Sequence, residues 1–183
     1  WGLNTLQQLL ITASTYAGMG LGNYFWGWLS DKIGRRPVLS IVPFIGGIGC
    51  LISAFSVNYL MLSACRFFVG IGVGAYGVAF NLFAEFLPTS KRGRLLSLFQ
   101  GVWTVGICYQ AMIVWLVLPN LGWRWVLAIA SAPYFLLIFF IPWMPESPRY
   151  FLVHHKAKKA WEIIKKAATV NRTTMLPGLL IDV

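Results

Sequence analysis

The stretch that decides the fold is Gly27-Trp28-Leu29-Ser30-Asp31-Lys32-Ile33-Gly34-Arg35-Arg36. An apolar segment of about residues 6–29 precedes and overlaps it, and a second one, residues 38–55, follows directly after Pro37. A bilayer core is about 30 Å thick and a helix rises about 1.5 Å per residue, so roughly 20 apolar residues cross it. The sequence therefore predicts a short charged turn outside the membrane, between two antiparallel membrane helices.

Two residues suit this turn for conformational reasons. Gly34 adopts positive φ at little cost, and Pro37 suits the first position of the next helix, where its missing N–H would be unpaired anyway. Four charged residues then gather at one membrane face: Asp31, Lys32, Arg35 and Arg36. One interpretation is a stop-transfer turn whose positive charges face the cytoplasm. That interpretation does not explain the acid among the bases or the glycines Gly27 and Gly34.

The composition is that of an integral membrane protein. Apolar residues make up 58% of the 183 residues and charged residues only 11%, which excludes an ordinary soluble domain. Hydropathy predicts five spans, at about residues 6–29, 38–55, 59–87, 95–118 and 125–143. Residues 146–183 are predicted to begin a cytoplasmic loop of a larger protein, so we expect the chain to be a fragment.

Basic residues are arranged as a topology signal. The chain has fifteen Lys and Arg against five Asp and Glu, a net charge of +10. Thirteen of the fifteen fall on one side of the predicted spans, while Arg124 lies on the other side and Arg66 lies inside a span. The positive-inside rule places the first side in the cytoplasm. Because the charges cluster at span ends, we expect no nucleic acid as a partner.

A basic amphipathic helix is predicted at residues 156–169. Ala157, Ala160, Trp161, Ile164 and Ala168 recur at helical spacing, and lysines occupy the remaining face. Such a helix either contacts anionic lipid headgroups or packs beneath the membrane helices. The sequence leaves these two alternatives open.

No pattern indicates a catalytic, metal or cofactor site. The three cysteines lie in apolar spans without metal-ligand spacing, and no nucleophile or phosphate-binding loop is apparent. The glycines at 72, 74 and 77 match G-x-G-x-x-G, but they lie inside a membrane span and lack the strand and acid of a nucleotide site. We interpret Gly70 and Gly74 as a G-x-x-x-G helix-packing surface. The sequence therefore predicts a protein that is not an enzyme and has no cofactor.

Arg66 is the strongest single candidate for solute binding. A charge at membrane depth costs at least about 2.5 kcal/mol unless it is paired or hydrated, which favours an orientation toward an interior acid or a cavity. The alternative is an arginine whose head reaches the outer headgroups. Further candidates are Gln100, Tyr109 and Gln110, whose polar groups either contact a solute or join helices together.

Acids and bases also gather at the predicted cytoplasmic face. Glu85 and Glu146 lie close in sequence to Arg92, Arg94 and Arg149. They are either solvated charges or, with Asp31, Arg35 and Arg36, a latch that holds one conformation and opens in another. Exposed ion pairs are individually weak, so only a network would bias such an equilibrium.

These residues resemble those of a known family. Gly27, Asp31, Lys32, Gly34, Arg35 and Arg36 reproduce the G-x-x-x-D-(R/K)-x-G-R-(R/K) turn between the second and third helices of the major facilitator superfamily. Further similarities are Arg66-x-x-x-Gly70, Glu85-x-x-Pro88 with Arg92-Gly93, Gly122-Trp123-Arg124 and Pro145-Glu146-Ser147-Pro148-Arg149. Together they resemble the sugar-porter-type branch, most closely synaptic vesicle two-related proteins and organic cation transporters.

The resemblance implies an all-α membrane fold, comprising helices two to six of a twelve-helix transporter. It implies alternating-access transport of a small organic solute, such as an organic ion, with a coupled proton or cation as an open possibility. It implies a multi-pass protein of the plasma membrane or a vesicle membrane. Gln100 falls where sugar porters place a substrate-contacting glutamine. Ile107 stands where some sugar porters carry another glutamine, which weakens the interpretation that the solute is a sugar. Other functions left open are a vesicle-membrane binding or regulatory partner that no longer transports, and a channel.

Overall fold

The computed structural model describes residues 2–88 and 91–170, which are helical along most of their length and contain no strand. The long helices are α1 (Thr5–Ile33), α2 (Arg35–Ala54) and α5 (Arg92–Leu121). One further helical stretch is divided into α3 (Tyr59–Val73) and α4 (Tyr76–Glu85). Another is divided into α6 (Trp123–Ala130), α7 (Ala132–Phe140) and the 3-10 turn η2 (Ile141–Trp143). The shorter helices α8 (Pro148–Val153) and α9 (Ala157–Val170) follow.

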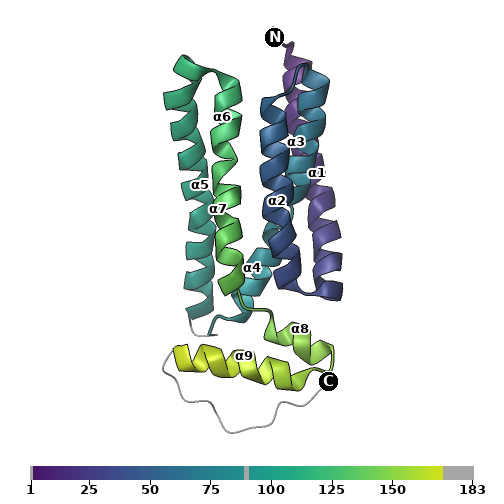
Figure 1. Ribbon diagram of the computed structural model, residues 1–183, viewed down its shortest axis with the longest axis vertical. Coiled ribbons are helices and arrows are strands. Elements are labelled where there is room, and N and C mark those ends of the chain that lie inside the picture. The colour runs from purple at the N-terminus through teal and green to yellow at the C-terminus, as the bar shows by residue number, and fades with distance from the viewer. Residues whose placement is uncertain (1, 89–90, 171–183) are drawn as a thin grey trace.

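The long helices form two groups. Figure 1 shows α1, α2 and α3 side by side on the right and α5 beside α6 and α7 on the left, with both α8 and α9 across the lower end. The groups are joined because α2 packs against both α6 and α7. The side views show the same elongated bundle, with the turn between α1 and α2 at the lower end.

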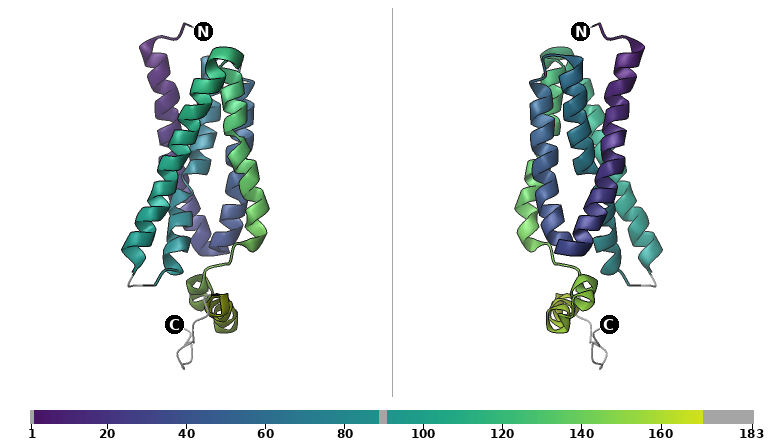
Figure 2. Two further views of the ribbon diagram at one scale, coloured as in Figure 1. Left: turned by 90° about the vertical axis from the view of Figure 1, so that its left-hand side faces the viewer. Right: turned by 90° about the vertical axis from the view of Figure 1, so that its right-hand side faces the viewer.

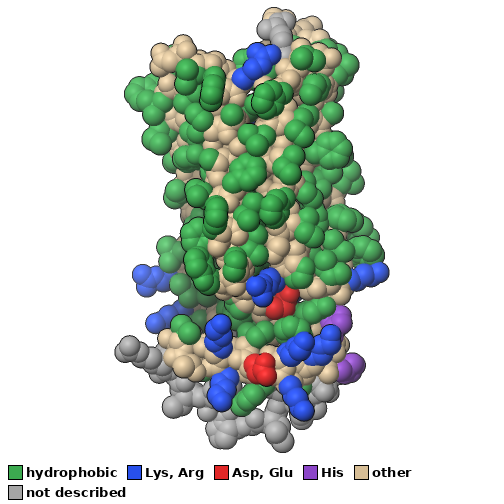
Figure 3. All heavy atoms as spheres, viewed as in Figure 1, with side chains coloured by type: hydrophobic (Ala, Val, Ile, Leu, Met, Phe, Trp, Pro, Cys, Tyr) green, Lys and Arg blue, Asp and Glu red, His purple; other side chains and the backbone are tan. Residues whose placement is uncertain are grey.

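Four stretches of the described residues are long and apolar enough to cross a membrane: Arg35–Ala54, Tyr59–Glu85, Arg92–Leu121 and Trp123–Trp143. Figure 3 shows hydrophobic side chains over most of the shaft and basic side chains gathered at its lower end, called the basic end below. α1 is not among the four stretches, although it has 29 residues and packs along α3. That α1 spans the membrane beside them stays a prediction.

Glycines allow the backbones of α1 and α3 to lie close together. A Cβ added at Gly70 of α3 would overlap the carbonyl oxygen of Thr15, and one at Gly74 would lie 2.5 Å from the backbone nitrogen of Asn23. On α1, Gly18 and Gly22 face the α3 backbone in the same way. The predicted packing role of Gly70 and Gly74 is confirmed. Trp26 closes the lower part of this interface, where its indole N–H donates to the carbonyl of Ile71 at 2.8 Å.

Two turns are shorter than the sequence predicts. α1 continues to Ile33 and α2 begins at Arg35, so Gly34 alone, at φ 102°, forms the turn. Pro37 is therefore the third residue of α2 rather than the first. This position costs no hydrogen bond, because the first four N–H groups of a helix have no intrahelical partner. Likewise, α5 continues through Pro119 to Leu121, and Gly122 at φ 81° makes the turn into α6.

Candidate functional site

The predicted charge cluster at the basic end centres on the carboxylate of Glu146. This carboxylate accepts hydrogen bonds from the backbone N–H groups of Arg35 at 2.9 Å, Arg36 at 3.1 Å and Ser147 at 2.8 Å. The first two are unpaired N–H groups at the start of α2, where the helix dipole also favours negative charge. Glu146 thus caps a helix that begins about 110 residues earlier in the chain.

A second acid completes the cluster. The guanidinium of Arg35 pairs with the carboxylate of Glu85, whose other oxygen accepts a hydrogen bond from the hydroxyl of Ser147. The side chains of Arg35 and Glu85 are only 17% and 13% exposed, so water screens this pair less than a surface pair. We call Arg35, Arg36, Glu85, Glu146 and Ser147 the basic-end network. It joins the start of α2, the end of α4 and the start of α8.

Gly34 is required by the same geometry for two reasons. Its φ of 102° lies in a region that L side chains rarely adopt. In addition, a Cβ at this position would lie 2.5 Å from Oε2 of Glu146 and 3.4 Å from the ring of Tyr150. Tyr150 itself reaches the end of α1, where its hydroxyl donates to the carbonyl of Lys32 at 3.2 Å.

Not every predicted gate residue belongs to this network. Arg36 also donates from its guanidinium to the carbonyl of Pro142 at 3.3 Å, and the ammonium of Lys32 lies over the ring of Trp28. The following residues form no ion pair within the described part of the chain: Asp31, Arg92, Arg94 and Arg149. A Cβ at Gly27 would meet nothing within 4 Å. The structure shows which of these residues are bonded, and the gate role of each predicted residue stays a prediction.

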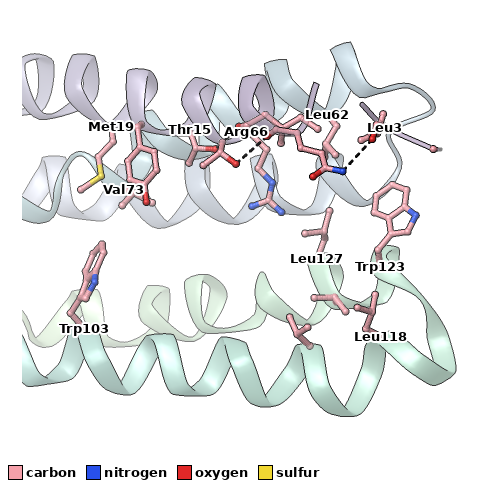
Figure 4. A pocket seen from close by; sticks show the side chains of 17 residues that line it. Leu3, Thr15, Met19, Leu62, Arg66, Val73, Trp103, Leu118, Trp123 and Leu127 are labelled. Carbon is pink, nitrogen blue, oxygen red and sulfur yellow. Dashed lines mark hydrogen bonds between the residues drawn. The ribbon is translucent and has the colours of Figure 1, made fainter. Parts of the chain in front are cut away.

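A cavity of about 800 Å³ opens between the two helix groups. α1 lines it with Gln8, Thr12 and Thr15, α3 with Arg66, and α5 and α6 with apolar and aromatic side chains. In Figure 4 the guanidinium of Arg66 points from α3 into the space that faces α5 and α6. The volume of the cavity falls in the range of roughly 300–1,000 Å³ that is typical of small-molecule sites.

The cavity carries one fixed positive charge. Arg66 is half-buried, and within the described residues its guanidinium forms no hydrogen bond or ion pair. The hydroxyls of Thr12 and Thr15 donate to carbonyls of their own helix, each at 3.2 Å, so their oxygens can still accept. No Asp or Glu is present in the described lining. This environment can bind a solute through charge and hydrogen bonds combined with ring contacts.

Of the predicted solute-binding residues, only Arg66 lines this cavity. Gln100 accepts a hydrogen bond from the hydroxyl of Tyr76, which lines a smaller neighbouring cavity of about 330 Å³. Tyr109 and Gln110 are half-buried and line neither cavity. Solute-binding roles for all four residues, Arg66 included, stay predictions.

Sequence reasoning missed several of these residues. Residues 6–29 include several polar side chains, but the sequence does not indicate that Gln8, Thr12 and Thr15 face a cavity. Trp103 lines the cavity from α5, and no pattern in the neighbouring sequence indicates this role. Ser147 directly before Pro148 is a helix-start signal, and its hydroxyl does cap α8 at the N–H of Tyr150. Its bond to Glu85 has no signal in the sequence.

The fold matches solved membrane transporters. A structure described as the major facilitator superfamily proton:xylose symporter XylE bound to 6-bromo-6-deoxy-D-glucose is 25% identical, with a TM-score of 0.74 over 88% of this chain and 41% of that chain. An inward-open structure of XylE from E. coli gives a TM-score of 0.65 at 23% identity, over 91% of this chain and 46% of that one. The helices therefore have the major facilitator fold, which defines a multi-pass integral membrane protein.

Sequence comparison identifies the branch. The model of the family described as "Sugar (and other) transporter" matches residues 2–175, and the chain belongs to this family. Organic cation/carnitine transporter 7 of Arabidopsis thaliana is 42% identical over 98% of this chain and 36% of its own length. Synaptic vesicle 2-related protein of Rattus norvegicus is 34% identical over 99% of this chain and 33% of its own length. The predicted resemblance is confirmed, and the chain spans about a third of the length of these curated relatives.

Proposed function

We propose that the protein containing this chain moves a small organic ion across the plasma membrane or a vesicle membrane by alternating access. The observation that carries the proposal is the position of Arg66 in a cavity that opens between two groups of membrane helices. A charge placed there is costly unless it is paired or hydrated, so an open cavity that admits water and an ionic solute suits it. The family is one of transporters, which agrees with this use of the cavity.

The lining favours an organic ion over a plain sugar. A guanidinium binds an anionic group such as a carboxylate, while the ring surface of Trp103 suits an apolar or cationic group. Outside the lining, Ile107 is apolar at the position where some sugar porters carry a second glutamine, and it lines neither cavity. The name of the relative from Arabidopsis thaliana also includes an organic cation and carnitine. Together these features support an organic ion as the solute.

The basic-end network supplies a latch for the access change. It connects the α1–α2 turn to α4 and α8, so a movement that separates these three elements at the basic end would break its bonds. Hydrogen bonds to charged groups contribute about 1.5–3 kcal/mol each, enough to shift an equilibrium between states that differ by a few kcal/mol. The latch keeps the basic end closed while solute enters the cavity from the opposite side.

Uptake measurements on the full-length protein test the proposal. The protein is reconstituted in vesicles and offered three radiolabelled solutes: a quaternary ammonium cation, a zwitterion that carries a carboxylate, and a hexose. We expect uptake of at least one of the two organic ions, saturating with concentration because each cycle carries a limited number of molecules. Uptake that rises linearly without saturation indicates a channel. No flux of any solute contradicts transport and favours a binding or regulatory protein of the same fold.

A further inference from the structure

Helix α9 presents an exposed basic face. Lys158, Lys159, Lys165 and Lys166 are all exposed, and Glu162 is the single acid of this helix. Since a helix turns about 100° per residue, positions 158, 161 and 165 lie on one side. Trp161, at the second of these positions, is 38% exposed. An exposed tryptophan between two lysines is typical of a helix at a membrane–water interface, where the ring lies at headgroup level.

The position of α9 agrees with such an interface. Figures 1 and 2 both show α9 at the basic end, with its axis across the long helices and hence along the membrane surface. α8 holds α9 there, and Ala160 on the face opposite the lysines is fully buried. The apolar side of α9 is therefore used for packing within the protein, which leaves the lysine side available.

Glu162 lies one helical turn from both Lys158 and Lys166, but no ion pair within the described residues neutralises the four lysines. Glu85 and Glu146 are already bonded within the basic-end network. None of the four lysines forms an ion pair within the described residues. Moreover, Arg92, Arg94 and Arg149 add exposed positive charge at the same end. The leaflet that surrounds the basic end supplies a negative surface, whose attraction acts over about 8 Å at physiological salt.

We propose that the lysine face of α9 binds anionic phospholipid headgroups of the adjacent leaflet. The lysines contact phosphate and carboxylate oxygens, and the indole of Trp161 lies among the headgroups. Each lysine near such a surface strengthens binding about fivefold. The partner is lipid rather than an acidic protein segment because α9 lies along the membrane surface and pairs its lysines with an exposed tryptophan.

Hydrogen exchange on the full-length protein tests this proposal. The protein is placed in nanodiscs of phosphatidylcholine alone or with increasing phosphatidylserine, and exchange is measured for residues 157–170 by mass spectrometry. We expect slower exchange as phosphatidylserine increases, with the effect reversed by high salt. Replacing all four lysines by glutamine, which preserves helix propensity, should raise the phosphatidylserine fraction needed at least about tenfold or abolish the response. The matched control replaces the same lysines by arginine and should keep the response.

Three results would overturn the proposal. Equal protection in both lipids would mean that α9 is held by protein contacts alone. A phosphatidylserine response that survives the glutamine variant would assign lipid binding to other residues. Lysine-dependent protection that persists without phosphatidylserine would indicate an acidic segment of the protein as the partner.

Discussion

Replacing Arg66 with glutamine is expected to lower uptake of the transported ion by at least about tenfold, because a hydrogen bond to a charged group contributes about 1.5–3 kcal/mol. Glutamine keeps a polar side chain but removes the single fixed charge of the described cavity lining. Initial rates of uptake into vesicles, measured across a range of solute concentrations, show whether solute affinity or turnover is lost. Arg66→Lys keeps the charge without the planar fork of donors and should retain part of the activity.

Two controls give this experiment its meaning. Lys91→Gln removes an exposed charge of the same sign outside the cavity and should leave uptake unchanged. The thermal unfolding midpoint of each variant shows whether the protein still folds. If Arg66→Gln folds normally and transports as well as the unaltered protein, the cavity around Arg66 is not the solute site.

Gly70→Ala is expected to produce a large loss of stability. The added methyl group would overlap the carbonyl oxygen of Thr15 and lie 3.0 Å from the backbone nitrogen of Met19. The atoms that the methyl group would meet belong to the backbone of α1, which cannot move aside as a flexible side chain would. α1 must therefore move away from α3. Overpacking typically costs about 1–3 kcal/mol, and we expect the upper end of that range, with a midpoint of thermal unfolding lowered by roughly 5 °C or more.

Gly20→Ala is the matched control for this substitution. Gly20 also lies on a membrane-length helix, but a Cβ there would meet nothing within 4 Å. Alanine is a better helix former than glycine, so this variant should be neutral or slightly stabilising. Equal stability of both variants would mean that α1 and α3 do not approach as closely as described.

The sequence predicted the helices and the charged ends, but not the pairing of the charges. Hydropathy and turn residues located the long helices to within a few residues, and the glycine spacing identified the packing surface at Gly70 and Gly74. By contrast, Asp31, Glu85 and Glu146 were equal candidates for the latch. Only the three-dimensional path of the chain places Glu146 at the first N–H groups of α2 and leaves the side chain of Asp31 exposed.

The residues that line the cavity could also be predicted only in part from the sequence. Arg66 stood out because a charge inside an apolar span is costly wherever it points. Trp103 and Gln100 lie three residues apart on α5, yet only Trp103 lines the larger cavity, while Gln100 bonds to Tyr76. Which of two polar or aromatic side chains faces a cavity depends on the rotation of the helix, which neighbouring helices determine and which local sequence does not record.

The basic-end network is proposed to control access to the cavity around Arg66, and thiol labelling of a cavity residue tests this control most directly. Thr15→Cys is introduced into the full-length protein without other cysteines, and a membrane-impermeant reagent is applied from each side, with and without Glu146→Gln. Glutamine weakens the bonds that cap α2, so we predict labelling from the basic side to rise about tenfold and labelling from the opposite side to fall. Unchanged labelling from both sides would contradict the claim.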